Sequence, residues 1–190
     1  MKKIAVFASG SGTNFQAIID AVHKGELQAD IQLLVCDKPD AFCIERAEKG
    51  NIPQFIFTAK EYANKEAYEK VILNKLENLN VEYIILAGYM RLIGQTLLRA
   101  FEGKIVNIHP SLLPAFPGKD AIGQALEAKA RVSGVTVHFV DEGMDTGPII
   151  AQQEVEISSE ETMESLEAKI HGIEHQLYPA VLQKLLTNNL

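Results

Sequence analysis

The alternation of short apolar runs with longer amphipathic stretches is the feature that most limits the folds open to this chain. The apolar runs are rich in Val, Ile, Leu and Ala, as in Ile4-Ala5-Val6-Phe7-Ala8 and Tyr83-Ile84-Ile85-Leu86-Ala87. Such runs are typical of strands buried on both faces, and in parallel sheets helices separate strands of this kind. The sequence therefore predicts an α/β fold with a mostly parallel twisted sheet and helices on both faces.

Glycine stops and apolar spacing give the expected boundaries of these elements. Up to residue 108, strands are predicted at 3–8, 31–36, 53–57, 83–87 and 105–108, and helices at 14–25, 41–49, 65–79 and 91–100. After residue 110 the pattern predicts a proline-rich loop at 110–118, a helix at 123–129, strands at 134–140 and 149–155, a turn-rich loop at 141–148 and a closing helix at 160–186. The last two strands are expected to pair antiparallel on one edge of the sheet.

Length and charge narrow the class of protein. A chain of 190 residues fits one domain, and 47% apolar and 23% charged residues are ordinary for a globular protein. No apolar run reaches the ~20 residues of a membrane-spanning helix, and the first run breaks at Gly10, too early for a signal peptide. The net charge of −7 argues against a nucleic-acid partner. Cys36 and Cys43 match no zinc spacing and suit a reducing cytosol, so we expect a cytoplasmic protein with no membrane contact.

A glycine-containing loop, Ser9-Gly10-Ser11-Gly12-Thr13-Asn14, joins the first predicted strand to the first predicted helix. Glycines allow close backbone approach to a ligand, and the helix N-terminus offers unpaired N–H groups to an anion. The loop lacks the third glycine of the dinucleotide pattern, since Phe15 stands there, and it lacks the Lys of a P-loop. We expect this loop to bind a phosphate; the alternative is a tight turn in which Thr13 or Asn14 caps the helix.

The segment from Val106 to Pro114 ends an apolar run with an amide, an imidazole and two prolines. Asn107 and His109 are two apart on a strand, so their side chains point to the same face. Such a pair suits a reaction in which negative charge builds on an oxygen while a proton moves. Asp145, in a loop with two glycines, is the candidate carboxylate that orients the imidazole, with Asp141 as a weaker competitor; a surface turn is the alternative.

A third candidate region follows the most apolar strand. Gly88 allows close approach there, and Met90 and Leu92 are suited to line an apolar slot for a flat heterocycle, although the pattern alone favours an ordinary strand-to-helix turn. His138 alternates with apolar neighbours and is interpreted as a residue of the strand surface. For Glu174 and His175 the periodicity leaves both solvent and the cleft open.

Four segments of the chain resemble motifs of the folate-dependent phosphoribosylglycinamide formyltransferases. They occur in the same order as in that family and together span nearly the whole chain. They are Gly10-Ser11-Gly12-Thr13-Asn14, Ala87-Gly88-Tyr89-Met90-Arg91, Asn107-Ile108-His109-Pro110-Ser111-Leu112-Leu113-Pro114 and Asp141-Glu142-Gly143-Met144-Asp145-Thr146-Gly147-Pro148. The string from Asn107 to Pro114 is specific for folate-dependent formyltransferases and their relatives, whereas the glycine loop is less specific.

The resemblance implies a Rossmann-like formyltransferase fold and a reaction of purine biosynthesis. The amine of phosphoribosylglycinamide attacks the formyl carbon of the co-substrate 10-formyltetrahydrofolate, tetrahydrofolate leaves, and no metal is required. One domain is expected over 1–190, with a phosphate-binding half at 1–100 and a catalytic and folate-binding half at 101–190. The expected partners are small molecules, and the oligomeric state is left open.

The resemblance also implies roles for individual residues. The catalytic set is Asn107, His109 and Asp145. The expected substrate-binding residues are Gly12, Thr13, Asn14 and Glu174. The expected folate-binding residues are Lys65, Met90, Arg91, Leu92, Ile93, Asp141 and Asp145. This chain has no histidine in the segment Lys119-Asp120-Ala121-Ile122, where some family members have one, so no role is carried over to that segment.

Two other functions compete with this interpretation. Another folate-dependent enzyme, such as a methionyl-tRNA formyltransferase or a formyltetrahydrofolate hydrolase, is expected to need an additional domain. A nucleotide-binding module without catalysis would explain the glycine loop but would leave Asn107, His109 and Asp145 without a role.

Overall fold

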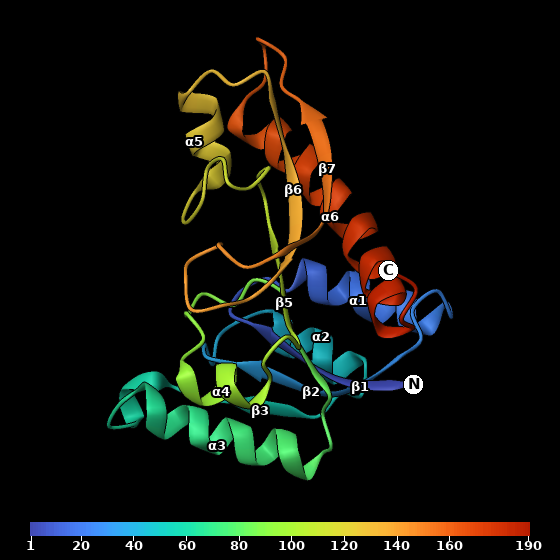
Figure 1. Ribbon diagram of the computed structural model, residues 1–190, viewed down its shortest axis with the longest axis vertical. Coiled ribbons are helices and arrows are strands. Elements are labelled where there is room, and N and C mark those ends of the chain that lie inside the picture. Colours follow the sequence, from blue (N-terminus) through green and yellow to red (C-terminus); the bar gives the residue numbers. More distant parts are fainter.

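The computed structural model describes residues 1–190 and contains one seven-stranded sheet with helices on both faces (Figure 1). The strands are β1 (Lys2–Ala8), β2 (Ala29–Cys36), β3 (Gln54–Ile56), β4 (Tyr83–Leu86), β5 (Ile105–His109), β6 (Val132–Phe139) and β7 (Ile149–Glu156). The α-helices are α1 (Thr13–His23), α2 (Cys43–Lys49), α3 (Lys65–Asn78), α4 (Gln95–Ala100), α5 (Ala121–Glu127) and α6 (Met163–Leu186), and a 3₁₀ turn spans Ala59–Glu61.

The order of the strands is β3-β2-β1-β4-β5-β6-β7. The first four neighbouring pairs are parallel, whereas β5–β6 and β6–β7 are antiparallel. The predicted mostly parallel sheet and its antiparallel edge are therefore confirmed. The chain runs outward from β1 to β3 and then crosses to β4 on the other side of β1. The carboxyl ends of β1 and β4 thus flank a topological switch point, which is where open α/β sheets bind ligands.

Alternate residues of the central strands supply two separate cores. On β1, Ile4, Val6 and Ala8 face the core under α1, α2, α5 and α6. The intervening Ala5 and Phe7 face the core under α3 and α4. All five side chains have no exposed surface, as expected for strands buried on both faces.

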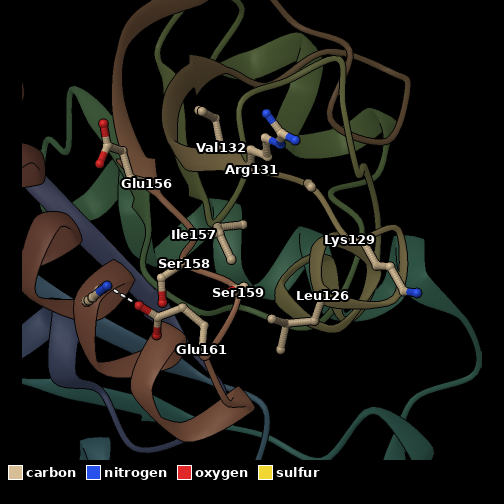
Figure 2. A pocket seen from close by; sticks show the side chains of 11 residues that line it. Leu126, Lys129, Arg131, Val132, Glu156, Ile157, Ser158, Ser159 and Glu161 are labelled. Atoms are coloured by element: carbon tan, nitrogen blue, oxygen red, sulfur yellow. Dashed lines mark hydrogen bonds and ion pairs between the residues drawn. The ribbon is translucent and has the colours of Figure 1, made fainter.

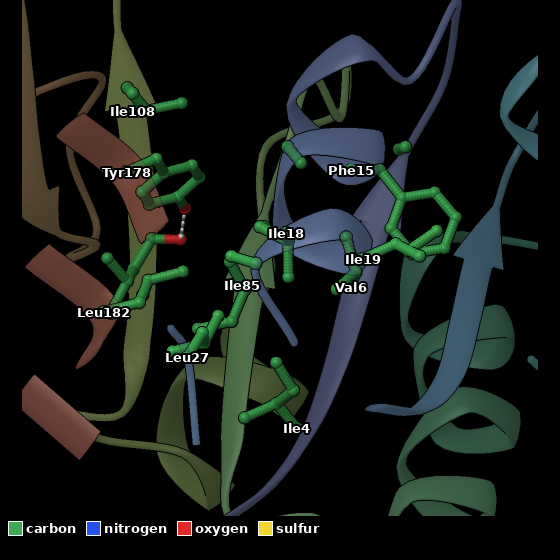
Figure 3. Packing of buried hydrophobic residues seen from close by; sticks show 14 of the residues in the cluster. Ile4, Val6, Phe15, Ile18, Ile19, Leu27, Ile85, Ile108, Tyr178 and Leu182 are labelled. Carbon is green, nitrogen blue, oxygen red and sulfur yellow. Dashed lines mark hydrogen bonds between the residues drawn. The ribbon is translucent and has the colours of Figure 1, made fainter. Parts of the chain in front are cut away.

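A buried tyrosine fills the point where β4 and β5 separate. Their parallel register is limited to Ile84–Ile105 and Ile85–Val106. Tyr178, on α6, is labelled in Figure 3. It donates its hydroxyl to the carbonyl of Leu86 at 2.7 Å, and the same hydroxyl lies 3.2 Å from the carbonyl of Val106. The side chain is fully buried. Buried backbone carbonyls need hydrogen-bond partners. Where β4 and β5 separate, the Tyr178 hydroxyl serves the carbonyls of Leu86 and Val106 as this partner.

Several predicted boundaries differ from the structure. The helix predicted at 91–100 begins only at Gln95, because residues 91–94 form a non-helical segment held by side chains from other elements. The closing helix begins at Met163 rather than at residue 160. It begins there because Thr162 and Ser165 form a reciprocal cap at its N-terminus. None of the helices combines the length and the apolar character needed to cross a membrane.

Candidate active site

The candidate site lies at the carboxyl ends of β1, β4 and β5. A hollow of about 300 Å³ opens there beside the glycine loop. Its lining residues are Gly10, Ser11, Gly12, Thr13, Asn14, Ala87, Gly88, Ile108, Pro110, His171 and Glu174. The structure thus brings the predicted phosphate loop, the end of β4 and the predicted Glu174 to one hollow.

The glycine loop ends in a left-handed residue that begins α1. Gly12 has φ 73° and is the N-cap, and no side chain caps the helix, so the alternative with Thr13 or Asn14 as cap is wrong. A Cβ on Gly12 would lie 2.6 Å from the Cβ of Cys43, which leaves room for glycine alone. The first-turn N–H groups of α1 therefore remain available to an anion at this end of the hollow.

Arg46 is a cation at this loop that the sequence did not identify. Its Nε donates to the carbonyl of Ser11 at 2.7 Å, and its guanidinium lies 4.8 Å from the ring centroid of Phe42. The residue reaches the loop from α2, which follows a different strand. Its spacing from the glycines carries no local signal, so only the fold reveals this contact.

Glu174 faces the cleft from α6 and is 5% exposed. Its Oε2 accepts a hydrogen bond from Asn14 Nδ2 at 3.0 Å. Burial raises the pKa of the Glu174 carboxyl, and the hydrogen bond from Asn14 opposes that rise. The Oδ1 of Asn14 is buried without a hydrogen-bond partner. The Nε2 of His175, next to Glu174 on α6, is buried without a partner too. This end of the hollow therefore holds an unused acceptor beside a carboxyl group, as a polar substrate requires.

His109 ends β5 and is 6% exposed. Its Nε2 lies 2.9 Å from the carbonyl of Phe116, and its Nδ1 lies 3.5 Å from Oδ2 of Asp145. A carbonyl only accepts, so Nε2 carries a hydrogen, and the carboxylate faces the other ring nitrogen. An imidazolium, which has an N–H on each nitrogen, would donate to the carbonyl and face the carboxylate as an ion pair. The pair is therefore arranged to hold and move a proton.

The structure distinguishes the two candidate aspartates. Asp145 has φ 57° and accepts the Gly118 N–H at 2.8 Å on the same oxygen that faces His109. Asp141 instead accepts from Gly143 N and Thr146 Oγ1 at 2.9 and 2.6 Å, and the Thr146 hydrogen bond lowers the pKa of its carboxyl. Asp141 thus stabilises the loop, and Asp145 reaches the imidazole.

His138 belongs to the same cluster, and its interpretation as a strand-surface residue is wrong. It is 2% exposed, because β6 is covered on this face. In the antiparallel register Asn107 is opposite His138, and Asn107 Nδ2 lies 3.4 Å from His138 Nε2. His138 Nδ1 lies 2.8 Å from the carbonyl of Phe139, which fixes the hydrogen on Nδ1 and leaves Nε2 as an acceptor. Burial lowers the pKa of His138, which favours this neutral form.

The predicted folate-binding segment follows β4, which lies between β1 and β5 in the sheet. Met90 and Leu92 are 69% and 54% exposed, whereas Ile93 is buried in the core under α3 and α4. The Nζ of Lys65 donates to the carbonyl of Leu92 at 2.8 Å. The guanidinium of Arg91 pairs with Asp37 at 2.8 Å. The exposed apolar side chains thus suit a slot, and the charged ones hold the backbone of the segment.

Another hollow, of about 720 Å³, is lined by residues of α5, β6, β7 and α6 and of the segments next to them (Figure 2). Its lining includes Leu126, Val132 and Ile157 together with the cations Lys129 and Arg131, neither of which forms an ion pair. It contains none of the predicted catalytic or binding residues. No group of three or more His, Cys, Asp or Glu side chains is arranged to hold a metal ion in the structure.

Comparison with known proteins gives one consistent result. Residues 2–182 match the formyl transferase family. The chain is 58% identical over 189 residues to a phosphoribosylglycinamide formyltransferase of Bacillus subtilis (strain 168), a match that covers 100% of this chain and 97% of that protein. A crystal structure of glycinamide ribonucleotide transformylase 1 from Geobacillus kaustophilus superposes with a TM-score of 0.96 at 63% identity and covers 98% of this chain and 99% of that one. The crystal structure of phosphoribosylglycinamide formyltransferase from Bacillus halodurans also superposes with a TM-score of 0.96, at 54% identity. That match covers 100% of this chain and 97% of the other chain.

Proposed function

The chain belongs to the formyl transferase family, and from this premise we propose that it transfers a formyl group from 10-formyltetrahydrofolate to the amine of phosphoribosylglycinamide. The observation that carries the proposal is that Asp145 lies against both His109 and His138, the partner of Asn107, while Ile108 and Pro110 of the same segment line the hollow of the glycine loop. A nucleotide-binding module has no need of such a cluster.

The glycine loop and Glu174 are assigned to the ribonucleotide. The N-terminus of α1 receives the phosphate, and Arg46 adds positive charge behind the loop. Glu174 and Asn14 bind polar groups of the substrate from the side of α6. This arrangement directs the amine toward the ends of β4 and β5, where the cluster lies.

The chemistry follows from the hydrogen bonds of the cluster. The amine nitrogen forms a bond to the formyl carbon, and the formyl oxygen gains negative charge. Asn107 Nδ2 and a protonated His109 stabilise this oxyanion. The bond from that carbon to the folate nitrogen then breaks, and a proton passes from the attacking nitrogen to the leaving one through His109 and Asp145.

To donate a hydrogen bond to the oxyanion, His109 must give up its present partner, the carbonyl of Phe116. Its Nε2–H is occupied by the carbonyl of Phe116, in the proline-rich loop. Donation to the oxyanion from that nitrogen requires the 110–118 loop to release this bond. The N–H groups of Asn107 are already near the cleft, and His138 holds the amide in place as an acceptor.

The folate is assigned to Met90, Leu92 and the backbone around them, with contributions from Asp141 to Asp145. Lys65, at the start of α3, is assigned to a carboxylate of the folate tail. Its Nζ lies at the outer surface of this segment, where such a tail leaves the slot.

Incubation with 10-formyltetrahydrofolate, with and without phosphoribosylglycinamide, tests the proposal. We expect tetrahydrofolate release only with the amine present, together with one formylated amine for each folate released. Release that ignores the amine would indicate a hydrolase, and nucleotide binding without any turnover would indicate a non-catalytic module.

A further inference from the structure

A buried aspartate outside the catalytic cluster connects the two predicted binding segments. Asp37 follows the end of β2, next to β1, and is 3% exposed. Its Oδ1 accepts the Ser9 hydroxyl at 2.5 Å, and its Oδ2 accepts Arg91 Nε at 2.8 Å. Both carboxylate oxygens are therefore used by residues from two other strand ends.

Ser9 extends this network to the backbone of the folate-binding segment. Its hydroxyl gives its one hydrogen to Asp37 and accepts the Met90 N–H at 2.9 Å. Its own backbone N–H donates to the carbonyl of Gly88 at 3.0 Å. Gly88, Met90 and Arg91 are thus fixed relative to the first residue of the glycine loop by bonds that converge on Ser9 and Asp37.

The other end of the segment is held from α3. The buried Glu69 accepts the Gly94 N–H at 2.8 Å, and Lys65 donates to the carbonyl of Leu92. Residues 88–94 contain no helix or strand, so these side chains replace the ladder that regular structure would supply. Between the two anchors the exposed side chains of Met90 and Leu92 face outward.

Stability alone is a poor reason for such a network. A buried ion pair loses hydration on folding, and apolar residues of similar volume often stabilise a protein as well. A charged pair does, however, fix direction and distance closely. We propose that Asp37 is a positioning residue for folate binding, which acts through Ser9 and Arg91 on the segment from Gly88 to Ile93. This inference rests on the proposed function.

The Asp37→Asn variant of the full-length protein tests the proposal. Its amide keeps the shape of the carboxylate, but it removes the charge opposite Arg91 and can present a donor to that guanidinium. We expect about a tenfold rise in KM for 10-formyltetrahydrofolate and in Kd for tetrahydrofolate, since loss of the charged hydrogen bond to Arg91 leaves the folate-binding segment less well positioned. We expect kcat at saturating folate and KM for phosphoribosylglycinamide to change less than about twofold. Asp40→Asn, an exposed aspartate in the same loop, is the matched control and should leave both KM values unchanged.

A double-mutant cycle distinguishes positioning from general damage. Arg91→Gln should raise the folate KM, and the double variant Asp37→Asn with Arg91→Gln should be no worse than the poorer single variant. If Asp37→Asn does not fold, Ser9→Ala takes its place with the same expected split. Unchanged folate KM and Kd, or equal rises in both substrates' KM values, would overturn the inference.

The tetrahydrofolate measurement separates this failure from a failure of the proposed function. Wild-type protein that binds tetrahydrofolate without formyl transfer would refute the proposed reaction, while the Kd comparison still decides the role of Asp37. Wild-type protein that does not bind tetrahydrofolate would overturn both.

Discussion

Asn14, in the first turn of α1, and Glu174, in the middle of the last helix, are joined by a hydrogen bond of 3.0 Å across 160 positions of sequence. The bond joins two residues that line the hollow and orients the Asn14 amide, so that its Oδ1 is left buried without a partner. The carboxyl is buried in this arrangement, and its pKa is raised for that reason.

Glu174→Gln should therefore change stability in a pH-dependent way. A carboxyl whose pKa is raised in the folded state loses stability as pH rises from the unfolded value of 4.5 through the folded value. Glutamine has no such loss, and its amide can donate to the orphan Oδ1 of Asn14. The variant should thus gain thermal stability relative to the wild type as the pH rises above about 4.5.

The same variant should bind phosphoribosylglycinamide less well, with a KM raised about tenfold through loss of a charged acceptor. Melting curves at several pH values and steady-state kinetics provide both measurements. Glu167→Gln, on the same helix but without contact to Asn14, is the control. A pH-independent difference in melting temperature would contradict the assigned burial of Glu174.

Asp145→Asn should lower kcat by about 10²–10⁴-fold, the usual contribution of a positioned acid–base group. Asparagine tolerates the left-handed backbone of this position and can still accept the Gly118 N–H, so the loop is expected to keep its shape. It cannot accept or stabilise the proton of His109 as a carboxylate does.

Asp141→Asn is the matched comparison, since Asp141 bonds only within its loop. We expect it to affect folate KM more than kcat. Single-turnover rates with both substrates saturating would separate these effects, and a kcat within about threefold of wild type for Asp145→Asn would remove that residue from the chemistry.

The sheet was predictable because its signal is local. The alternation of Ile4 and Val6 with Ala5 and Phe7 fills two cores from one strand, and the same period recurs in β2 and β4. The non-helical stretch before Gln95 was not predictable, since its apolar pattern fits a helix and its backbone is held by the distant Ser9, Lys65 and Glu69.

The site was only partly predictable for a similar reason. Asn107 and His109 are two apart on one strand, so their shared face follows from the sequence. The contact between Asn107 and His138 depends on the register of β5 with β6, and no local pattern specifies that register. Arg46 reaches the glycine loop from another βα unit and has no sequence signal either.

Gly12→Ala should weaken both folding and ribonucleotide binding. The new methyl group would lie 2.6 Å from the Cβ of Cys43 at a φ of 73°, so helix α2 or the loop must move. We expect a loss of about 1–3 kcal/mol in the free energy of unfolding and a raised KM for phosphoribosylglycinamide. Gly10→Ala is the control for stability, because no atom lies within 4 Å of its Cβ position and its φ is not left-handed. Urea denaturation of both variants gives the comparison, and equal midpoints would contradict the packing described for Gly12.

Two buried tyrosines provide opposite predictions for the same chemical change. The hydroxyl of Tyr178 bonds the carbonyl of Leu86 and lies within reach of that of Val106, whereas the buried hydroxyl of Tyr68 has no partner. Tyr178→Phe leaves buried carbonyls without their donor and should cost about 1–3 kcal/mol of unfolding free energy. Tyr68→Phe removes an unsatisfied polar group and should be neutral or stabilising. Urea denaturation of the two variants measures the difference, and a Tyr178→Phe variant as stable as Tyr68→Phe would show that β4 and β5 do not need this donor where they separate.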